Sequence, residues 1–208
     1  MSGLPANQRN DSKYLRSNGA VGAAEGLMYK AAASLNHADK ANEEEAWGNS
    51  QESLPQLYRA IRSLKLPTTQ RVVSTAAGED VRGQCFGITA SSCGAPRVAP
   101  SSRKVVDIVK VVAASIKEAD PTFTFTSLQI ILGARAQWHV DQANCGPSMA
   151  MALGPYRGGQ LMVYDKEKHD QAVLGGGCWN SFDGRDPHCV MPFSGQRAAI
   201  VAFTHYAA

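Results

Sequence analysis

Apolar side chains recur at intervals of three and four in two segments of the chain. In residues 103–119 the repeating face carries Val105, Ile108, Val109, Val112 and Ile116. This spacing predicts an amphipathic helix that ends at the Asp120–Pro121 pair, because a proline disfavours helical geometry in the residue before it. The same spacing predicts a shorter helix over residues 53–64, and Pro67 follows it.

After Pro121 the pattern changes to short, β-rich stretches separated by glycine, asparagine, aspartate or proline. They are residues 123–132, 148–154, 159–165, 178–184, 188–195 and 197–205. Residues 83–103 are predicted to be loop with one more strand near 85–89. Strands at this spacing are typical of a sandwich or barrel. The predicted fold class is therefore α+β, a jelly-roll-like or cupin-like barrel with N-terminal helices packed on one sheet.

Two parts are predicted along the 208 residues. Residues 1–50 are expected to be an extension that is partly disordered and partly helical, and residues 51–208 a folded domain with the barrel at about 121–206. No apolar stretch is long enough for a membrane-spanning helix, and no secretory signal opens the chain. Five scattered cysteines without a CxxC pair favour a reduced setting. We expect an intracellular protein, nuclear or cytoplasmic; its oligomeric state is left open.

Basic residues are unevenly distributed, although the net charge of the chain is only +3. Residues 59–104 carry eight Lys and Arg against two acidic residues, a balance of +6. Such a segment can meet phosphates, which makes nucleic acid a candidate partner. A solvated surface is the alternative, because no Lys/Arg cluster is dense enough to decide.

Three side chains in the strand-rich region form a candidate metal site and are the predicted catalytic residues. His139 and Asp141 are one residue apart, so at the end of a strand both point to one face, while Val140 points the other way into packing. A third ligand must come from another strand, and His188 stands at the start of the apolar run 188–195. Two imidazoles and a carboxylate leave three positions open on an octahedral ion, as in non-haem Fe(II) oxygenases.

Arg197 follows His188 by nine residues and begins the next predicted strand. The intervening FSG is predicted to be a turn that folds the two strands side by side. An arginine at this place can bind the distal carboxylate of a dicarboxylic co-substrate with its two-pronged guanidinium. A surface arginine at a strand end is the alternative.

The sequence resembles the 2-oxoglutarate/Fe(II)-dependent dioxygenase superfamily over about residues 121–206. The similar stretches are WHVDQANCGPSMAMALGPYRGGQLMVYD and WNSFDGRDPHCVMPFSGQRAAIVAFTH. The spacing of N, G and S after HVD, the LGxYxGGxL segment and FDGxxPHxVxPFxGxR look most like the TET/JBP-like branch, which includes thymine and methylcytosine hydroxylases. The resemblance implies a double-stranded β-helix, Fe(II) at His139, Asp141 and His188, and 2-oxoglutarate at Arg197. It also implies hydroxylation of a substrate C–H bond with O₂, for which ascorbate can serve as reductant.

Other polar residues are candidates for supporting roles. Asn144 and Ser148 are expected either to line the site for substrate or to serve turn chemistry. Asp183 and Arg185 are expected to orient the following His188. Gln129 is expected to face the co-substrate pocket. The pair Gly158–Gly159 is expected to allow a tight turn.

Two departures from the family pattern bear on the co-substrate. Ala199 stands where many relatives carry a polar residue two positions after the arginine, and the strand before HVD reads LQIIL without the usual asparagine. Within the dioxygenase hypothesis, a nucleobase such as 5-methylcytosine and a protein side chain (prolyl-type hydroxylation) both remain candidate substrates. A non-catalytic cupin-like binding module is the alternative from a different class, and Mn(II), Co(II) or Ni(II) are alternative metals.

Overall fold

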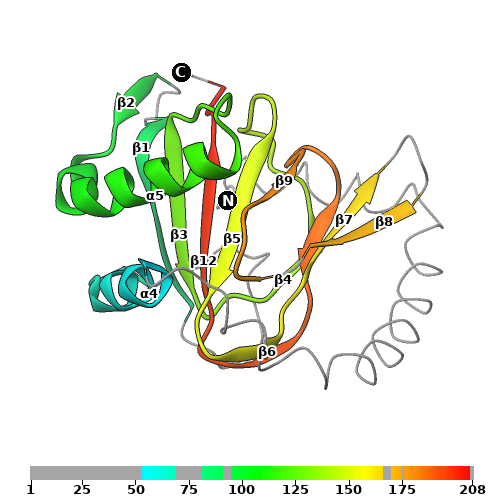
Figure 1. Cartoon of the computed structure of the whole chain (residues 1–208). Helices are drawn as coiled ribbons and strands as arrows, with labels where there is room; N and C mark the ends of the chain where they lie inside the picture. Colours follow the sequence, from blue (N-terminus) through cyan, green and yellow to red (C-terminus); the bar gives the residue numbers. More distant parts are fainter. Residues whose placement is uncertain (1–52, 69–80, 91–94, 166–169, 175, 207–208) are drawn as a thin grey trace, which may run out of the picture. The chain divides into compact units, whose positions relative to one another are not determined.

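The computed structural model describes residues 53–68, 81–90, 95–165, 170–174 and 176–206 (Figure 1). Its helical elements are α4 (Ser53–Ser63), the 3₁₀ helix η3 (Pro100–Val105) and α5 (Val106–Ala119). Its strands are β1 (Arg82–Ala90), β2 (Pro96–Val98), β3 (Ser127–Leu132), β4 (Ala136–His139), β5 (Ser148–Leu153), β6 (Tyr156–Gly158), β7 (Leu161–Asp165), β8 (Asp170–Leu174), β9 (Asn180–Phe182), β10 (His188–Val190), β11 (Phe193–Gly195) and β12 (Ala198–Phe203). The predicted extension, residues 1–50, lies outside the described residues.

Antiparallel pairing arranges the described strands in three sheets. The largest has the order β2-β1-β3-β12-β5-β9, a second has the order β4-β10-β7-β8, and β11 pairs with β6 alone. The largest sheet is wider than the predicted barrel, because β1 and β2 lie before residue 121 and add to its edge through β3. The fold is therefore a mixture of helices and antiparallel sheets, as the α+β prediction requires.

Both helices cover one face of the six-stranded sheet. Figure 1 shows α5 lying across β1, β3, β12 and β5, with α4 beside it. The predicted apolar face of α5 is the one that is buried: Val112 and Ile116 are almost inaccessible, and Val105 at the end of η3 joins them. They pack with alternate residues of β3 and β12, such as Ile130 and Ile200, in a single core cluster. Burial of this helical face, rather than any capping side chain, holds α5 on the sheet.

The opposite face of the same sheet carries several of the candidate site residues. On β3 and β12 the residues between the core positions, among them Gln129 and Ala199, are half-buried. A strand turns successive side chains to opposite faces, so these residues lie away from the helices. The ring of Phe182, at the end of β9, meets the ring of His188 on β10 with centroids 5.2 Å apart. The two larger sheets therefore meet at the candidate metal site.

Several predicted boundaries are wrong, each for a local reason. The run 188–195 is two strands, because Met191 and Pro192 interrupt it between β10 and β11. FSG is consequently not a turn that pairs the flanking strands: it is β11, and β10 and β12 belong to different sheets. The strand before HVD is β4 rather than LQIIL, which is β3. Val140 is 41% exposed instead of packed.

None of the helices in the described part of the chain is long and apolar enough to cross a membrane. Four of the five cysteines (Cys85, Cys145, Cys178 and Cys189) are described, and all four are free thiols. The fifth lies outside the described residues. The four described cysteines therefore form no disulfide with one another.

Candidate metal centre

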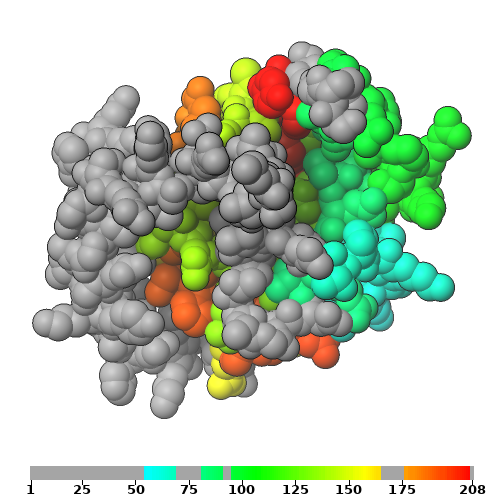
Figure 2. Space-filling view, turned by 180° about the vertical axis from the view of Figure 1, so that it is seen from behind, coloured from blue at the N-terminus to red at the C-terminus, as the bar shows by residue number. Residues whose placement is uncertain are grey.

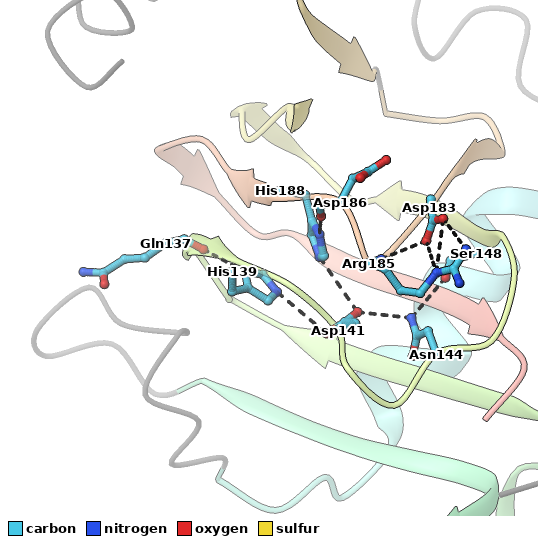
Figure 3. Close-up of polar contacts among 9 residues, drawn as sticks. All are labelled: Gln137, His139, Asp141, Asn144, Ser148, Asp183, Arg185, Asp186 and His188. Carbon is cyan, nitrogen blue, oxygen red and sulfur yellow. Dashed lines mark hydrogen bonds and ion pairs between the residues drawn. The ribbon is translucent and has the colours of Figure 1, made fainter. Parts of the chain in front are cut away.

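Pairing of two strands brings the predicted ligands together. β10 runs antiparallel to β4 with His188 directly opposite His139, and directly opposite residues share one face of a sheet. On the face turned away in Figure 1, the yellow-green region around β4 and the orange region around β10 adjoin (Figure 2). Asp141 follows β4 by two residues, and its backbone N–H donates to the Gly184 carbonyl at 2.8 Å. The carboxylate thus lies beside both imidazoles, as Figure 3 shows.

The two imidazoles are anchored in the same way. Nδ1 of His139 lies 2.7 Å from the Gln137 carbonyl, and Nδ1 of His188 lies 2.8 Å from the Asp186 carbonyl. A carbonyl oxygen can only accept, so Nδ1 carries the proton in each ring. In the neutral rings this leaves the Nε2 lone pairs for a metal, and those atoms face Asp141. The tautomer needed for metal binding is therefore set by the backbone.

The donor set fits a divalent metal ion. One ligand atom from each of His139, Asp141 and His188 lies within 4.8 Å of the other two. The Nε2 atoms are 3.9 Å and 3.8 Å from the nearer carboxylate oxygens of Asp141. Bonds of about 2.1 Å place neighbouring ligands of an octahedral ion about 3 Å apart, so small side-chain rotations suffice for the ligands to close on an ion. Two nitrogens and a carboxylate oxygen are the ligands of Fe(II) oxygenases, and also suit related divalent metals.

Asn144 lies against the carboxylate ligand, and Ser148 is bonded to Asn144. The Asn144 amide nitrogen donates to Asp141 Oδ2 at 3.3 Å and to Ser148 Oγ at 3.1 Å. Asn144 is 7% exposed, and Ser148 is completely buried at the start of β5. Both residues therefore support Asp141.

Arg197 packs against two aromatic rings. Its guanidinium carbon is 5.6 Å from the Tyr156 ring centroid and 5.7 Å from that of Phe193, within the range of cation–π contacts. Burial lowers the pKa of the Arg197 guanidinium, while the adjacent Tyr156 acts in the opposite direction. The residue is 6% exposed and forms no ion pair with a described carboxylate. Its Nε has no hydrogen-bond partner among the described residues. A buried guanidinium without a carboxylate partner among the described residues is suited to bind an anionic ligand.

Gly159 leaves room for the Arg197 side chain, a role that the sequence did not reveal. A Cβ on Gly159 would lie 3.0 Å from Arg197 Cδ and 3.1 Å from Nε. Its φ of +71° agrees with the tight turn expected at the glycine pair. Tyr156 was also missed, although it stands in the LGxYxGGxL segment. The glycine pair was a visible signal for a turn, but the arginine that needs the space is distant in the sequence.

The remaining predicted site residues lie in different surroundings. Gln129 is half-buried on the face of β3 away from the helices, and its amide makes a long 3.5 Å bond to the Ile130 carbonyl. Asp183 and Arg185 bind each other in a two-pronged ion pair, with Arg185 Nη2 and Nε at 2.6 Å and 2.9 Å from the carboxylate oxygens. This pair lies in the turn that leads from β9 to His188, and the ion pair raises the pKa of Arg185.

The described basic residues of segment 59–104 are exposed. Two of them, Arg62 on α4 and Arg82 on β1, line a hollow of about 190 Å³ together with Leu132 and Gly133. Exposure agrees with either a solvated surface or a surface that meets phosphates.

Comparison with known proteins finds matches among solved structures only. No family model and no curated protein matches the sequence. An oxidoreductase of the 2OG-Fe(II) oxygenase family from Burkholderia pseudomallei is 16% identical with a TM-score of 0.52, covering 74% of this chain and 79% of that one. NgTET1, solved in complex with 5mC DNA, is 14% identical with a TM-score of 0.50, covering 79% and 69%. A prolyl-4-hydroxylase from Pseudomonas putida is 17% identical with a TM-score of 0.43, covering 73% and 83%. At these identities the first two similarities establish a shared fold: this chain has the fold of 2OG-Fe(II) oxygenase structures.

Proposed function

We propose that this protein is an Fe(II)- and 2-oxoglutarate-dependent dioxygenase that hydroxylates a C–H bond. The observation that carries the proposal is the facial set of His139, Asp141 and His188, with both imidazoles held in the metal-binding tautomer by backbone carbonyls. The fold shared with 2OG-Fe(II) oxygenases supports it. We further propose that the two larger sheets form the double-stranded β-helix of that superfamily.

In this proposal the three ligands hold the metal and Arg197 holds the co-substrate. The metal would supply O₂ activation coupled to decarboxylation of 2-oxoglutarate to succinate and CO₂. The chain's own part is to bind and orient. Arg197 binds the distal carboxylate with its guanidinium, and the rings of Tyr156 and Phe193 shield that contact from water. Ala199 cannot add a hydrogen bond there, so Arg197 carries more of the affinity than it would beside a polar residue.

The proposed substrate is a nucleobase in nucleic acid, such as 5-methylcytosine. The exposed basic residues of segment 59–104 support this choice, because they could contact phosphates. NgTET1, one of the structures that share the fold, was solved with 5mC DNA. Mass spectrometry of methylated DNA, RNA and peptide pools after incubation would tell this substrate from a prolyl side chain. Hydroxylated peptide without altered nucleoside would overturn the nucleobase assignment.

The test of the chemistry is succinate release from 2-oxoglutarate with Fe(II), ascorbate and O₂, together with direct binding of metal and 2-oxoglutarate. His139→Ala and Asp141→Ala should weaken metal binding by more than about 100-fold, since even loss of outer supporting groups costs 10- to 100-fold. Arg197→Ala should keep metal binding and lose 2-oxoglutarate affinity. Arg157→Ala, which removes an exposed arginine from β6, is the matched control. A wild-type protein that binds metal but neither binds nor consumes 2-oxoglutarate would instead be a binding module.

A further inference from the structure

A compact hydrogen-bonded group supports the Asp141 carboxylate through Oδ2, the oxygen that also lies 3.8 Å from His188 Nε2. Its centre is Asn144, in the loop between β4 and β5, whose amide nitrogen bonds both Asp141 Oδ2 and Ser148 Oγ. Its backbone N–H also donates to the Asp141 carbonyl at 3.3 Å. A carboxylate oxygen only accepts, so the nitrogen end of the Asn144 amide must face Asp141. Figure 3 shows this chain of contacts running from Ser148 through Asn144 to Asp141.

We infer that Asn144 is a positioning residue that makes Asp141 a one-oxygen ligand; this inference rests on the proposed function. Each carboxylate oxygen faces one imidazole, Oδ1 at 3.9 Å from His139 Nε2 and Oδ2 at 3.8 Å from His188 Nε2. The Asn144 amide engages Oδ2 alone, so in this inference Oδ1 is the oxygen that binds the metal. A carboxylate that binds through both oxygens would occupy a second coordination position. Three open positions are needed for a chelating oxoacid and O₂, and restraint of Oδ2 keeps the third one available.

Burial keeps Asn144 in this role. The side chain is 7% exposed, and the fully buried Ser148 holds its amide from the other side. A buried amide that lost these partners would leave polar groups without hydrogen bonds, which is unfavourable, so the arrangement is strongly preferred. Backbone bonds from the chain end add support: Cys145 N–H donates to the Thr204 carbonyl at 2.8 Å, and Tyr206 N–H donates to the Ala143 carbonyl at 2.9 Å.

Gly184 provides the space that the amide occupies. A Cβ on Gly184 would lie 2.6 Å from Asn144 Nδ2 and 3.3 Å from Ser148 Oγ, too close for the present arrangement. Gly184 does not have a positive φ, so alanine is compatible with its backbone. Gly184→Ala therefore displaces the Asn144 amide while Asn144 and Ser148 both remain in the chain.

The test measures metal binding of the whole protein with Co(II), without any turnover. Asn144→Ala should weaken Co(II) binding by about 10- to 100-fold and change the visible absorption of the bound Co(II), since freeing Oδ2 alters the coordination number. Gly184→Ala should shift both readouts in the same direction. Ser148→Ala should have a smaller effect, and that effect should vanish when Asn144 is already alanine. Gln142→Ala, which removes an exposed amide from the same loop, is the matched control.

The outcomes separate this inference from the proposed function. If wild-type protein binds no Co(II), the proposed function fails. If wild type binds Co(II) and the Asn144→Ala and Gly184→Ala variants keep its affinity and spectrum, only the role of Asn144 is overturned. Additive losses in the Asn144→Ala/Ser148→Ala double variant would likewise overturn it, because Ser148 would then act independently. If Asn144→Ala does not fold, Gly184→Ala and Ser148→Ala carry the same expectations, and circular dichroism without metal verifies their folding.

Discussion

His188 faces His139 directly across the β4–β10 pair, with ring centroids 4.2 Å apart and ring planes inclined by 53°. The register of strand pairing therefore places the two imidazoles next to each other. The edge of Phe182 restrains the His188 ring from another side. A ligand pair built on paired strands is held more precisely than one built on loops.

Replacement of Gly159 by alanine should displace the Arg197 side chain. The added Cβ would lie 3.0 Å from Arg197 Cδ and 3.1 Å from Nε, so the arginine must shift away from its present position. Loss of a charge-assisted contact of about 1.5–3 kcal/mol predicts 2-oxoglutarate binding weakened about 10- to 100-fold, with Co(II) affinity retained. Calorimetric titration of each ligand measures both quantities.

Gly158→Ala is the control for the Gly159 experiment. Gly158 has a similar positive φ of +79°, but its Cβ would meet the Pro192 carbonyl rather than Arg197. Both variants should lower thermal stability through backbone strain, and only Gly159→Ala should lose 2-oxoglutarate affinity selectively. Equal losses of affinity in the two variants would contradict the assigned role of Gly159.

Cysteine reactivity should differ sharply along the chain. Burial raises the pKa of the Cys189 thiol to about 12, so on the order of one molecule in 10⁵ carries the thiolate at neutral pH. Cys145 and Cys178 are exposed. Alkylation of native protein followed by peptide mass spectrometry should label these two first and Cys189 only after unfolding. Early labelling of Cys189 would show that β10 opens readily in the native state.

Asp120 should make stability depend on acid pH. Its carboxylate accepts from the Thr122 hydroxyl at 2.7 Å and from the Thr122 N–H at 2.9 Å, and these bonds lower its pKa. A lowered pKa contributes stability that is fully present above about pH 4 and is lost as the pH falls through the folded-state value. Asp120→Asn should therefore lower the melting temperature at pH 7, and the difference from wild type should shrink toward pH 2.

Glu118→Gln removes a charge from the same end of α5 and serves as the control for Asp120→Asn. Its melting temperature should follow that of wild type across the same pH range. A gap between wild type and Asp120→Asn that stays constant down to pH 2 would mean that the carboxylate charge is not the source of the stabilisation.

The sheet–helix core should be sensitive to the loss of methyl groups from β12. Ile200 is fully buried, and its truncation to alanine should lower the free energy of unfolding by about 2–5 kcal/mol. Val111, on the outer side of α5, is 44% exposed, so Val111→Ala should change the free energy of unfolding by less than about 0.5 kcal/mol. Urea unfolding followed by circular dichroism compares the two. Similar losses would show that the helix layer is not packed as described.

Local patterns were sufficient for the helices and for most of the strands. The spacing of Val112 and Ile116 predicted the buried face of α5, and alternation predicted β3, β5, β7, β9 and β12 near their observed places. The short strands β2, β4, β6 and β8 were missed, because each is only three to five residues long. β4 and β6 also have few apolar positions, and pairing with the distant strands β10 and β11, rather than local propensity, makes them strands.

The candidate ligands could be predicted for a similar reason. His139 and Asp141 are close in sequence, and His188 opens an apolar run. The relation of Gly184 to Asn144, or of Gly159 to Arg197, depends on strand pairing between distant segments. No sequence window contains that information. The prediction that FSG is a turn failed in the same way, because its partner β6 lies far upstream.

The place of β12 in the sheet has a consequence for how the chain folds during synthesis. β3 and β5 both precede β12 in the sequence, yet they do not pair with each other, since β12 lies between them and bonds to both. During synthesis, the edge of β3 and the edge of β5 that pair with β12 lack hydrogen-bond partners until β12 has left the ribosome. The segment after β12, at Thr204 and Tyr206, is also bonded to the loop that carries Asp141. The loop that carries Asp141 therefore gains these bonds only after β12 has formed, and a chain stopped before β12 would leave one edge of β3 and one edge of β5 unpaired.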